Sequence, residues 1–198
     1  MKPQKDPEGY KKLLVYKKAD LLHALALELA EEIKNVERGL RGLTGEINKI
    51  LLELADQIGR AARSPKSNIV EGWKRNSTKE YYEYLGFSIG STEEMREDCE
   101  DIIKGKYKKL MGVKGITGEK GLALQEVGKL PFYPLDPLLS LVVRVFLSCK
   151  ELSFLLYKLQ ESLETKMKAE GILPIRQKLK NRQQETKAAD DWLKNYLK

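Results

Sequence analysis

Few residues in this sequence could perform chemistry, and none of their arrangements forms an active site. His23 is the only histidine and lies among leucines, a setting typical of a half-buried side chain rather than a general base. Ser64, Lys66 and Ser67 could form a serine–lysine pair, but they flank Pro65, where serine hydroxyls usually make turn hydrogen bonds. We therefore expect a protein that is not an enzyme and holds no cofactor.

Six carboxylates between positions 93 and 101 are the one candidate for a metal site. Neighbouring like charges without a histidine are more typical of a solvated helix face, and Lys104 and Lys106 follow as ion-pair partners. The glycines of residues 112–121 follow no strand pattern, so they do not predict a phosphate-binding loop. No metal is expected. The carboxylates are Glu93, Glu94, Glu97, Asp98, Glu100 and Asp101.

Basic clusters are the stronger functional signal. Lysines and arginines number 36 against 29 acidic residues, giving a net charge of +7, and such a balance favours an anionic partner. Basic side chains neutralise phosphates without reading sequence, and no zinc finger or groove-reading helix is present to add specificity. Charge alone leaves an ordinary basic surface as the alternative. The candidate nucleic-acid-binding residues are Arg60, Arg63, Lys66, Lys74, Arg75, Lys106, Lys108 and Lys109.

The elements that would position these residues are helices. Apolar residues recur at alternating steps of three and four, which is the seam of helices packed in a bundle. The predicted fold is all-α, an antiparallel up-down four-helix bundle with left-handed packing and a C-terminal helical extension. The predicted helices cover residues 16–36, 46–71, 78–104 and 137–168.

Glycine and proline predict where these helices end. Residues 35–45 hold three glycines and are expected to form a loop. Pro65 should kink or break the second helix, and Asp136 with Pro137 should start the fourth. The predicted organisation is a flexible arm at 1–9, a bundle at 10–170 with a linker at 105–136, and a helical suffix at 171–198, whose Trp192 and Tyr196 dock on the bundle or a neighbour.

A turn between the second and third helices carries most of the special residues. Gly72 is expected to end the helix with a positive φ, and Ser77 with Glu80 forms a capping box. Asn68 and Glu71 should bond locally with neighbouring arginines. This turn is predicted to be structural.

Two features predict self-association. Gly86 and Gly90 leave one stripe of the third helix almost bare, which favours close packing against the second helix or a neighbouring subunit. The fourth helix has more apolar surface than one core can cover. The predicted oligomer interface therefore contains Gly86, Gly90, Leu141, Phe146 and Leu155.

The cysteines and the apolar segments of the sequence bear on the cellular location of the protein. Cys99 and Cys149 fall on apolar helical positions and are expected to be buried free thiols. No signal peptide is evident, and the most apolar run, residues 138–149, is too short to span a membrane. The predicted location is the cytoplasm.

Spaced motifs in residues 60–98 resemble those of a known family. Arg60-Ala61, Ser64 to Gly72, Ser77 to Glu80, and Gly90-Ser91 with Glu94 occur in the order of its signature, and Tyr16 to Ala19 resembles the start of its first helix. The family is the four-helix-bundle family that includes the intervening-sequence proteins of 23S ribosomal RNA genes. The linker and the suffix depart from its compact pattern, although the suffix resembles that of longer members.

The resemblance implies an assembly and a set of partners. It implies a homopentameric barrel with a basic surface that associates with RNA. One branch, the accessory variability determinant proteins of diversity-generating retroelements, also binds a reverse transcriptase. The alternative that the residues leave open is a purely structural protein–protein interaction oligomer with no nucleic-acid ligand.

Overall fold

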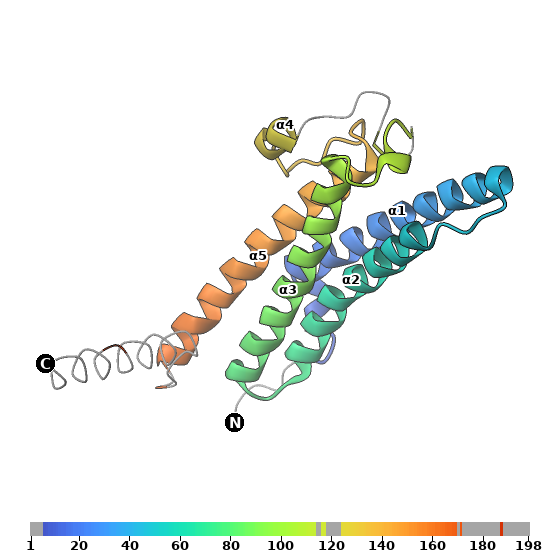
Figure 1. Ribbon diagram of the computed structural model, residues 1–198. Coiled ribbons are helices and arrows are strands. Elements are labelled where there is room, and N and C mark those ends of the chain that lie inside the picture. Colours follow the sequence, from blue (N-terminus) through green and yellow to red (C-terminus); the bar gives the residue numbers. More distant parts are fainter. Residues whose placement is uncertain (1–5, 114–115, 118–123, 170, 172–186, 188–198) are drawn as a thin grey trace, which may run out of the picture.

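The computed structural model describes residues 6–113, 116–117, 124–169, 171 and 187, and these residues form an all-α bundle. Each long helix packs against two others in the order α1, α2, α3, α5 and back to α1. Consecutive long helices run in opposite directions (Figure 1). This confirms the predicted all-α fold. The elements are η1 (Gly9–Lys12), α1 (Leu14–Thr44), α2 (Lys49–Lys74), α3 (Thr78–Ile103), η2 (Lys108–Leu110), α4 (Leu124–Lys129) and α5 (Leu141–Ala169).

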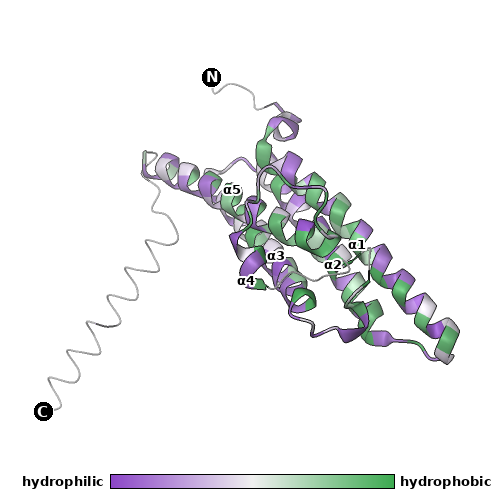
Figure 2. Cartoon of the chain, turned by 90° about the horizontal axis from the view of Figure 1, so that it is seen from above, coloured by the Kyte–Doolittle hydropathy of each residue, from purple (hydrophilic) through white to green (hydrophobic). Residues whose placement is uncertain are grey.

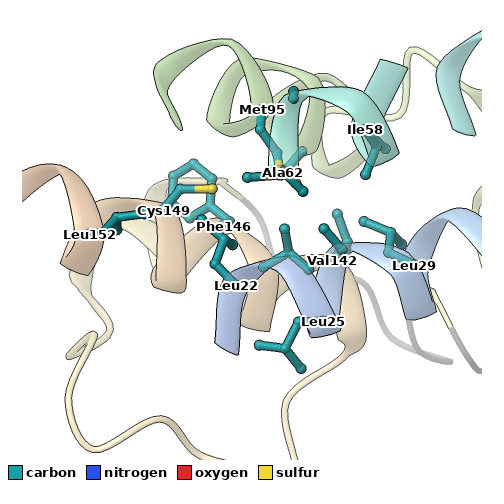
Figure 3. Close-up of a cluster of buried hydrophobic side chains, with 14 of the residues drawn as sticks. Leu22, Leu25, Leu29, Ile58, Ala62, Met95, Val142, Phe146, Cys149 and Leu152 are labelled. Carbon is teal, nitrogen blue, oxygen red and sulfur yellow. The ribbon is translucent and has the colours of Figure 1, made fainter. Parts of the chain in front are cut away.

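The core lies where the predicted apolar seams of the four long helices meet. Leu22 of α1, Ile58 of α2 and Met95 of α3 are fully buried in one cluster that also contains Phe146 of α5 (Figure 3). Polar and apolar residues alternate around each helix (Figure 2). Burial of one apolar face per helix is what holds such a bundle together.

The first helix is longer than predicted. It continues through Gly39 and Gly42 to Thr44, so the expected loop at residues 35–45 is wrong. Gly45 ends the helix with φ of 72°, and its N–H donates to the Arg41 carbonyl at 2.8 Å. The tip of the α1–α2 hairpin reaches past the other long helices (Figure 1).

The second helix passes Pro65 without interruption, so the predicted break is also wrong. The helix begins at Lys49, where the Asn48 side chain accepts a hydrogen bond from the Leu51 N–H at 3.3 Å. Pro65 is buried, and its carbonyl accepts a further hydrogen bond from the Ser88 hydroxyl of α3 at 3.1 Å. This bond ties α2 to α3 at the proline, whereas the backbone donor that Pro65 lacks would have served the Ala61 carbonyl one turn earlier.

The linker between α3 and α5 belongs to the core. Leu110, Ile116 and Val127 are fully buried, and the Val142 N–H donates to the Ile116 carbonyl at 3.1 Å. The helix α5 begins at Leu141, not at Pro137 as predicted.

A turn precedes α5, and the residues just before this turn contact α1. The Asp136 carboxylate accepts a hydrogen bond from the Leu138 N–H at 2.8 Å within this turn. Just before it, the Tyr133 ring covers the Lys18 ammonium at 4.7 Å from the ring centroid. Lys18 also pairs with Glu151 at 2.8 Å, so the end of the linker covers an ion pair that joins α1 to α5.

The described part of the N-terminal segment packs on the bundle. The Trp73 indole N–H donates to the Asp6 carbonyl at 2.9 Å, and Gly9 lies so close to the Trp73 ring that a Cβ there would come within 2.6 Å of it. The predicted flexible arm is therefore docked from residue 6 onward.

At the other end, Gly171 has the left-handed φ of 71° expected just after α5. Trp192 and Tyr196 of the predicted suffix lie outside the described residues. Within the described part of the chain, no helix has the length and apolarity needed to cross a membrane.

Candidate nucleic-acid interface

The outward face of α2 carries a row of basic side chains. Lys49, Arg60, Arg63 and Lys74 are all exposed, and at 3.6 residues per turn their spacing places them on one side of the helix. The two carboxylates on this helix that form ion pairs, Asp56 and Glu71, are used by other cations. None of the four has an ion pair among the described residues. We call these four residues the α2 basic line.

Three of the predicted nucleic-acid-binding residues are already paired. Lys66 contacts the Asp20 carboxylate of α1, which raises the pKa of this lysine. Lys106 pairs with Asp101 at 2.6 Å. These two have less charge to offer an external anion than the α2 basic line does.

Arg75 is the third of them and is held by the start of α3. Its guanidinium donates to Glu71 at 3.2 Å and to the Tyr84 hydroxyl at 2.5 Å, and it lies over the Tyr84 ring at 5.0 Å from the centroid. Its contacts are those of a structural residue.

Lys108 and Lys109 extend the basic surface toward the hairpin tip. Both are exposed on η2 without an ion pair among the described residues. Lys109 and Lys49 line the same open pocket of about 390 Å³ beside the tip. Ile47 and Ile50 also line it, and they are 55% and 64% exposed. The tip is therefore both basic and apolar.

The predicted role of Gly72 is structural, but the predicted reason is wrong. Gly72 lies inside α2, and the positive-φ glycines of the described chain do not include it. A Cβ on Gly72 would lie 2.6 Å from Cδ2 of Tyr81 and 2.9 Å from Cβ of Tyr84. Glycine is required here because α3 approaches the backbone of α2 too closely for any side chain.

Other signature residues join α2 to α3. Ser91 donates to the Ser64 hydroxyl at 2.8 Å, and the Asn68 amide donates to the same oxygen at 3.1 Å. Ser64 therefore bridges two helices instead of serving a turn, and Asn68 bonds to a serine and not to an arginine as predicted. Sequence reasoning missed this link because its partners are 27 residues apart.

Two other predictions about this turn agree with the structure. The Ser77 hydroxyl accepts a hydrogen bond from the Glu80 N–H at 3.4 Å at the start of α3, which confirms Ser77 as the helix cap. Glu71 pairs with Arg75, as predicted.

The predicted oligomer interface is only partly available at the surface. Leu141 and Phe146 are buried in the core of the chain itself, so they cannot contact another subunit. Leu155 is half-buried against that core. Gly86 faces Gln160 of α5 with room for a Cβ at 3.7 Å, and Gly90 has open space around it, so neither packs closely against α2. Apolar side chains that are exposed on α3 and α5 are Phe87, Phe154 and Tyr157.

The remaining chemical groups fit structural roles. Cys99 and Cys149 are fully buried free thiols, as predicted, and burial raises the pKa of both. Among the described residues, no group of histidine, cysteine and carboxylate side chains could hold a metal ion. Two of the predicted acidic residues pair with lysines as expected, Glu100 with Lys104 and Asp101 with Lys106.

The pKa values of Asp98 and His23 are also shifted from their usual values. Burial raises the pKa of Asp98 to about 6, although the Gln57 amide donates to its carboxylate at 3.0 Å and lowers it. Burial, together with the nearby charges of Lys66 and Arg63, lowers the pKa of the half-buried His23. Sequence patterns alone identified neither shift.

The α2 basic line and the contacts between α2 and α3 fall within one region of recognised similarity. The family model for the 23S rRNA-intervening sequence protein matches residues 11–110, a range that contains α1, α2 and α3. Comparisons with curated proteins and with solved structures give no match.

Proposed function

The chain belongs to the 23S rRNA-intervening sequence protein family, and from this premise we propose that it is a non-enzymatic, oligomeric scaffold that binds RNA through the α2 basic line. The single observation that carries the proposal is the row of cations on one exposed helix face, none of which forms an ion pair with a described residue. Such cations release counterions from a polyanion and bind it without reading its sequence.

The length of the row suits an extended polyanion. Lys49 and Lys74 are 25 positions apart, which corresponds to about 38 Å along a helix. Lys109 extends the row beside Lys49. A duplex carries a phosphate charge about every 1.7 Å along its axis, so it presents many more charges over this length than a compact anion does.

We propose that the scaffold is a closed homo-oligomer, with five subunits as the number that the family resemblance implies. Phe87 and Phe154 are 62% and 50% exposed on α3 and α5, and covering such surface contributes about 25 cal/mol per Å². Repeating the α2 basic line around one axis would multiply its charge. Size-exclusion chromatography coupled to light scattering tests this, and a monomer at micromolar concentration would contradict it.

The same exposed aromatic residues favour a second candidate function, a protein-interaction oligomer without a nucleic-acid ligand. A reverse transcriptase is the protein partner implied by the resemblance to the accessory variability determinant branch. Co-purification of the two proteins with and without ribonuclease treatment would show whether such contact requires RNA.

The test of the main proposal is a titration with a hairpin RNA at two or more salt concentrations. The variant Arg63→Glu with Lys74→Glu should bind more weakly, and its slope of log K against log salt should flatten by about 1.5 for each subunit in contact, because each lost phosphate contact removes about 0.7–0.9.

The matched control is Lys129→Glu with Lys168→Glu. These exposed lysines of α4 and α5 lie off the α2 basic line and have no ion pair among the described residues. Both variants replace two cations by two glutamates, so the net charge changes equally. The control should keep the parent slope. If both variants lost RNA affinity equally, the loss would be due to the change in net charge alone. That result would refute the proposal that RNA binds along α2.

A further inference from the structure

Two ion pairs bracket an open stretch of the groove between α1 and α2. Lys66 of α2 contacts Asp20 of α1 at one end, and Lys34 of α1 pairs with Asp56 of α2 at 2.8 Å at the other. Because the helices are antiparallel, the residues between these pairs on the two helices face each other across the groove. We call this stretch the α1–α2 seam.

The α1–α2 seam holds an imidazole and two guanidinium groups on neighbouring helical turns. His23 lies one turn after Asp20 on α1, and Arg63 lies one turn before Lys66 on α2, with Arg60 one turn further. These positions follow from the helical repeat and from the register that the two ion pairs set.

The surface beside these groups is open. Gly59 also lies in this stretch of α2, and a Cβ built on it would meet nothing within 4 Å. Arg60 and Arg63 are exposed and have no ion pair among the described residues. A phosphate could therefore approach the arginines and the imidazole without displacing a side chain.

The charges that face His23 come from both helices. They are Asp20 on its own helix and Lys66 and Arg63 on α2. Asp20 is already engaged by Lys66, so the balance around the imidazole is positive. Burial and these two cations lower the pKa of His23, and an anion seated beside the ring would act in the opposite direction by favouring the imidazolium form.

We propose that His23 is part of the RNA-binding surface, where it shares a backbone phosphate with Arg63, and that RNA binding protonates it. This inference rests on the proposed function. It adds an α1 residue to the RNA-binding surface and couples RNA binding to the uptake of one proton. The imidazolium then donates to a phosphate oxygen that Arg63 also binds.

The sign of the pH effect follows from linkage. Because the bound phosphate favours the protonated ring, RNA affinity rises as the pH falls through the histidine pKa of the complex, and it levels off below the lower pKa of the free protein. The gain expected from one exposed charge contact is about two- to fivefold. The salt slope should steepen by about 0.7–0.9 over the same range.

The experiment uses the fact that the chain has a single histidine. Full-length protein labelled with ¹³C-histidine gives one imidazole resonance, which is titrated with pH alone and with a saturating hairpin RNA at low salt. The expected result is an upward shift of the histidine pKa in the complex. In parallel, His23→Gln should lose the two- to fivefold gain in RNA affinity between pH 7.5 and pH 5.5.

Burial raises the pKa of Asp98 to about 6, which lies within the pH range of this experiment, so Asp98 supplies the control. It lies on α3, so Asp98→Asn should keep the pH dependence of RNA affinity that His23→Gln loses. An RNA complex in which the histidine pKa is unchanged overturns this inference and leaves the proposed function standing. Absence of salt-sensitive RNA binding at any pH overturns both.

Discussion

Replacing Gly72 by alanine should destabilise the bundle through a collision between α2 and α3. The new Cβ would lie 2.6 Å from Cδ2 of Tyr81 and 2.9 Å from Cβ of Tyr84. Separations below 3 Å between carbon atoms are strongly repulsive, so one helix has to move. The Cβ of Tyr84 is bonded to its backbone, and the Tyr81 ring packs edge-on against Trp73 at 6.2 Å between centroids. Neither neighbour can rotate away without disturbing the core.

The magnitude is best measured against a second glycine of the same helix. Gly59 also lies inside α2, but a Cβ there would meet nothing within 4 Å. Both substitutions gain the helix propensity of alanine, about 1 kcal/mol, whereas only Gly72→Ala incurs overpacking, which typically costs about 1–3 kcal/mol. The two variants should therefore differ in free energy of unfolding by about 1–3 kcal/mol.

Thermal unfolding at one protein concentration is the assay, because the melting temperature of an oligomer depends on concentration. For a chain of this size, 1 kcal/mol moves the melting temperature by about 2–4 °C. Gly72→Ala should therefore melt about 2–12 °C below Gly59→Ala. Equal melting temperatures would show that the close approach of α2 and α3 is not what requires glycine at position 72.

Three further predictions concern buried polar groups. Because burial raises the pKa of Asp98 to about 6, the native state binds a proton more tightly than the unfolded chain, and stability falls as the pH rises through about 4 to 6. Asp98→Asn should then melt above the parent at pH 7.5, and the gain should shrink below pH 6; a gain that does not change with pH would contradict this. The Lys18–Glu151 pair is only 18% and 10% exposed, so Glu151→Gln should cost about 3 kcal/mol in urea unfolding, whereas replacing both residues by methionine should cost less. A double variant as unstable as the single one would count against this reading. Cys99 and Cys149 should resist a thiol reagent in the native protein and react fully after unfolding, because both are fully buried; fast native reaction would show that the core opens.

The existence of the four helices could be predicted from the sequence, because each long helix buries one face and the resulting three-four spacing is local information. Residues such as Leu22 and Met95 recur at that spacing and are fully buried. The ends of the helices could not be predicted equally well. Pro65 suggests a break on local grounds, but α2 is held against α3 at this point by contacts such as the Ser88 hydrogen bond, whose donor is 23 residues away.

The candidate site, too, could be predicted only in part from the sequence. The cations of α2 are visible in the sequence, but which of them are free depends on partners from other helices. Lys66 is paired because Asp20 lies across the groove, 46 residues away, whereas Arg63 on the next turn of α2 has no such partner among the described residues. Leu141 and Phe146 were predicted at an interface because the sequence does not show that linker residues such as Val127 join the same buried core.

That linker also makes the two poles of the bundle chemically different. Leu110, Ile116 and Val127 close one pole, with Lys108 and Lys109 at its surface, while the opposite pole carries Trp73 and the docked N-terminal residues. A cyclic assembly of such subunits, with its axis along the bundle, has two unlike rims, since cyclic symmetry contains no operation that exchanges them. A partner that recognises one rim would therefore bind the ring from one side only, and two rings could pair back to back through the rim that remained free.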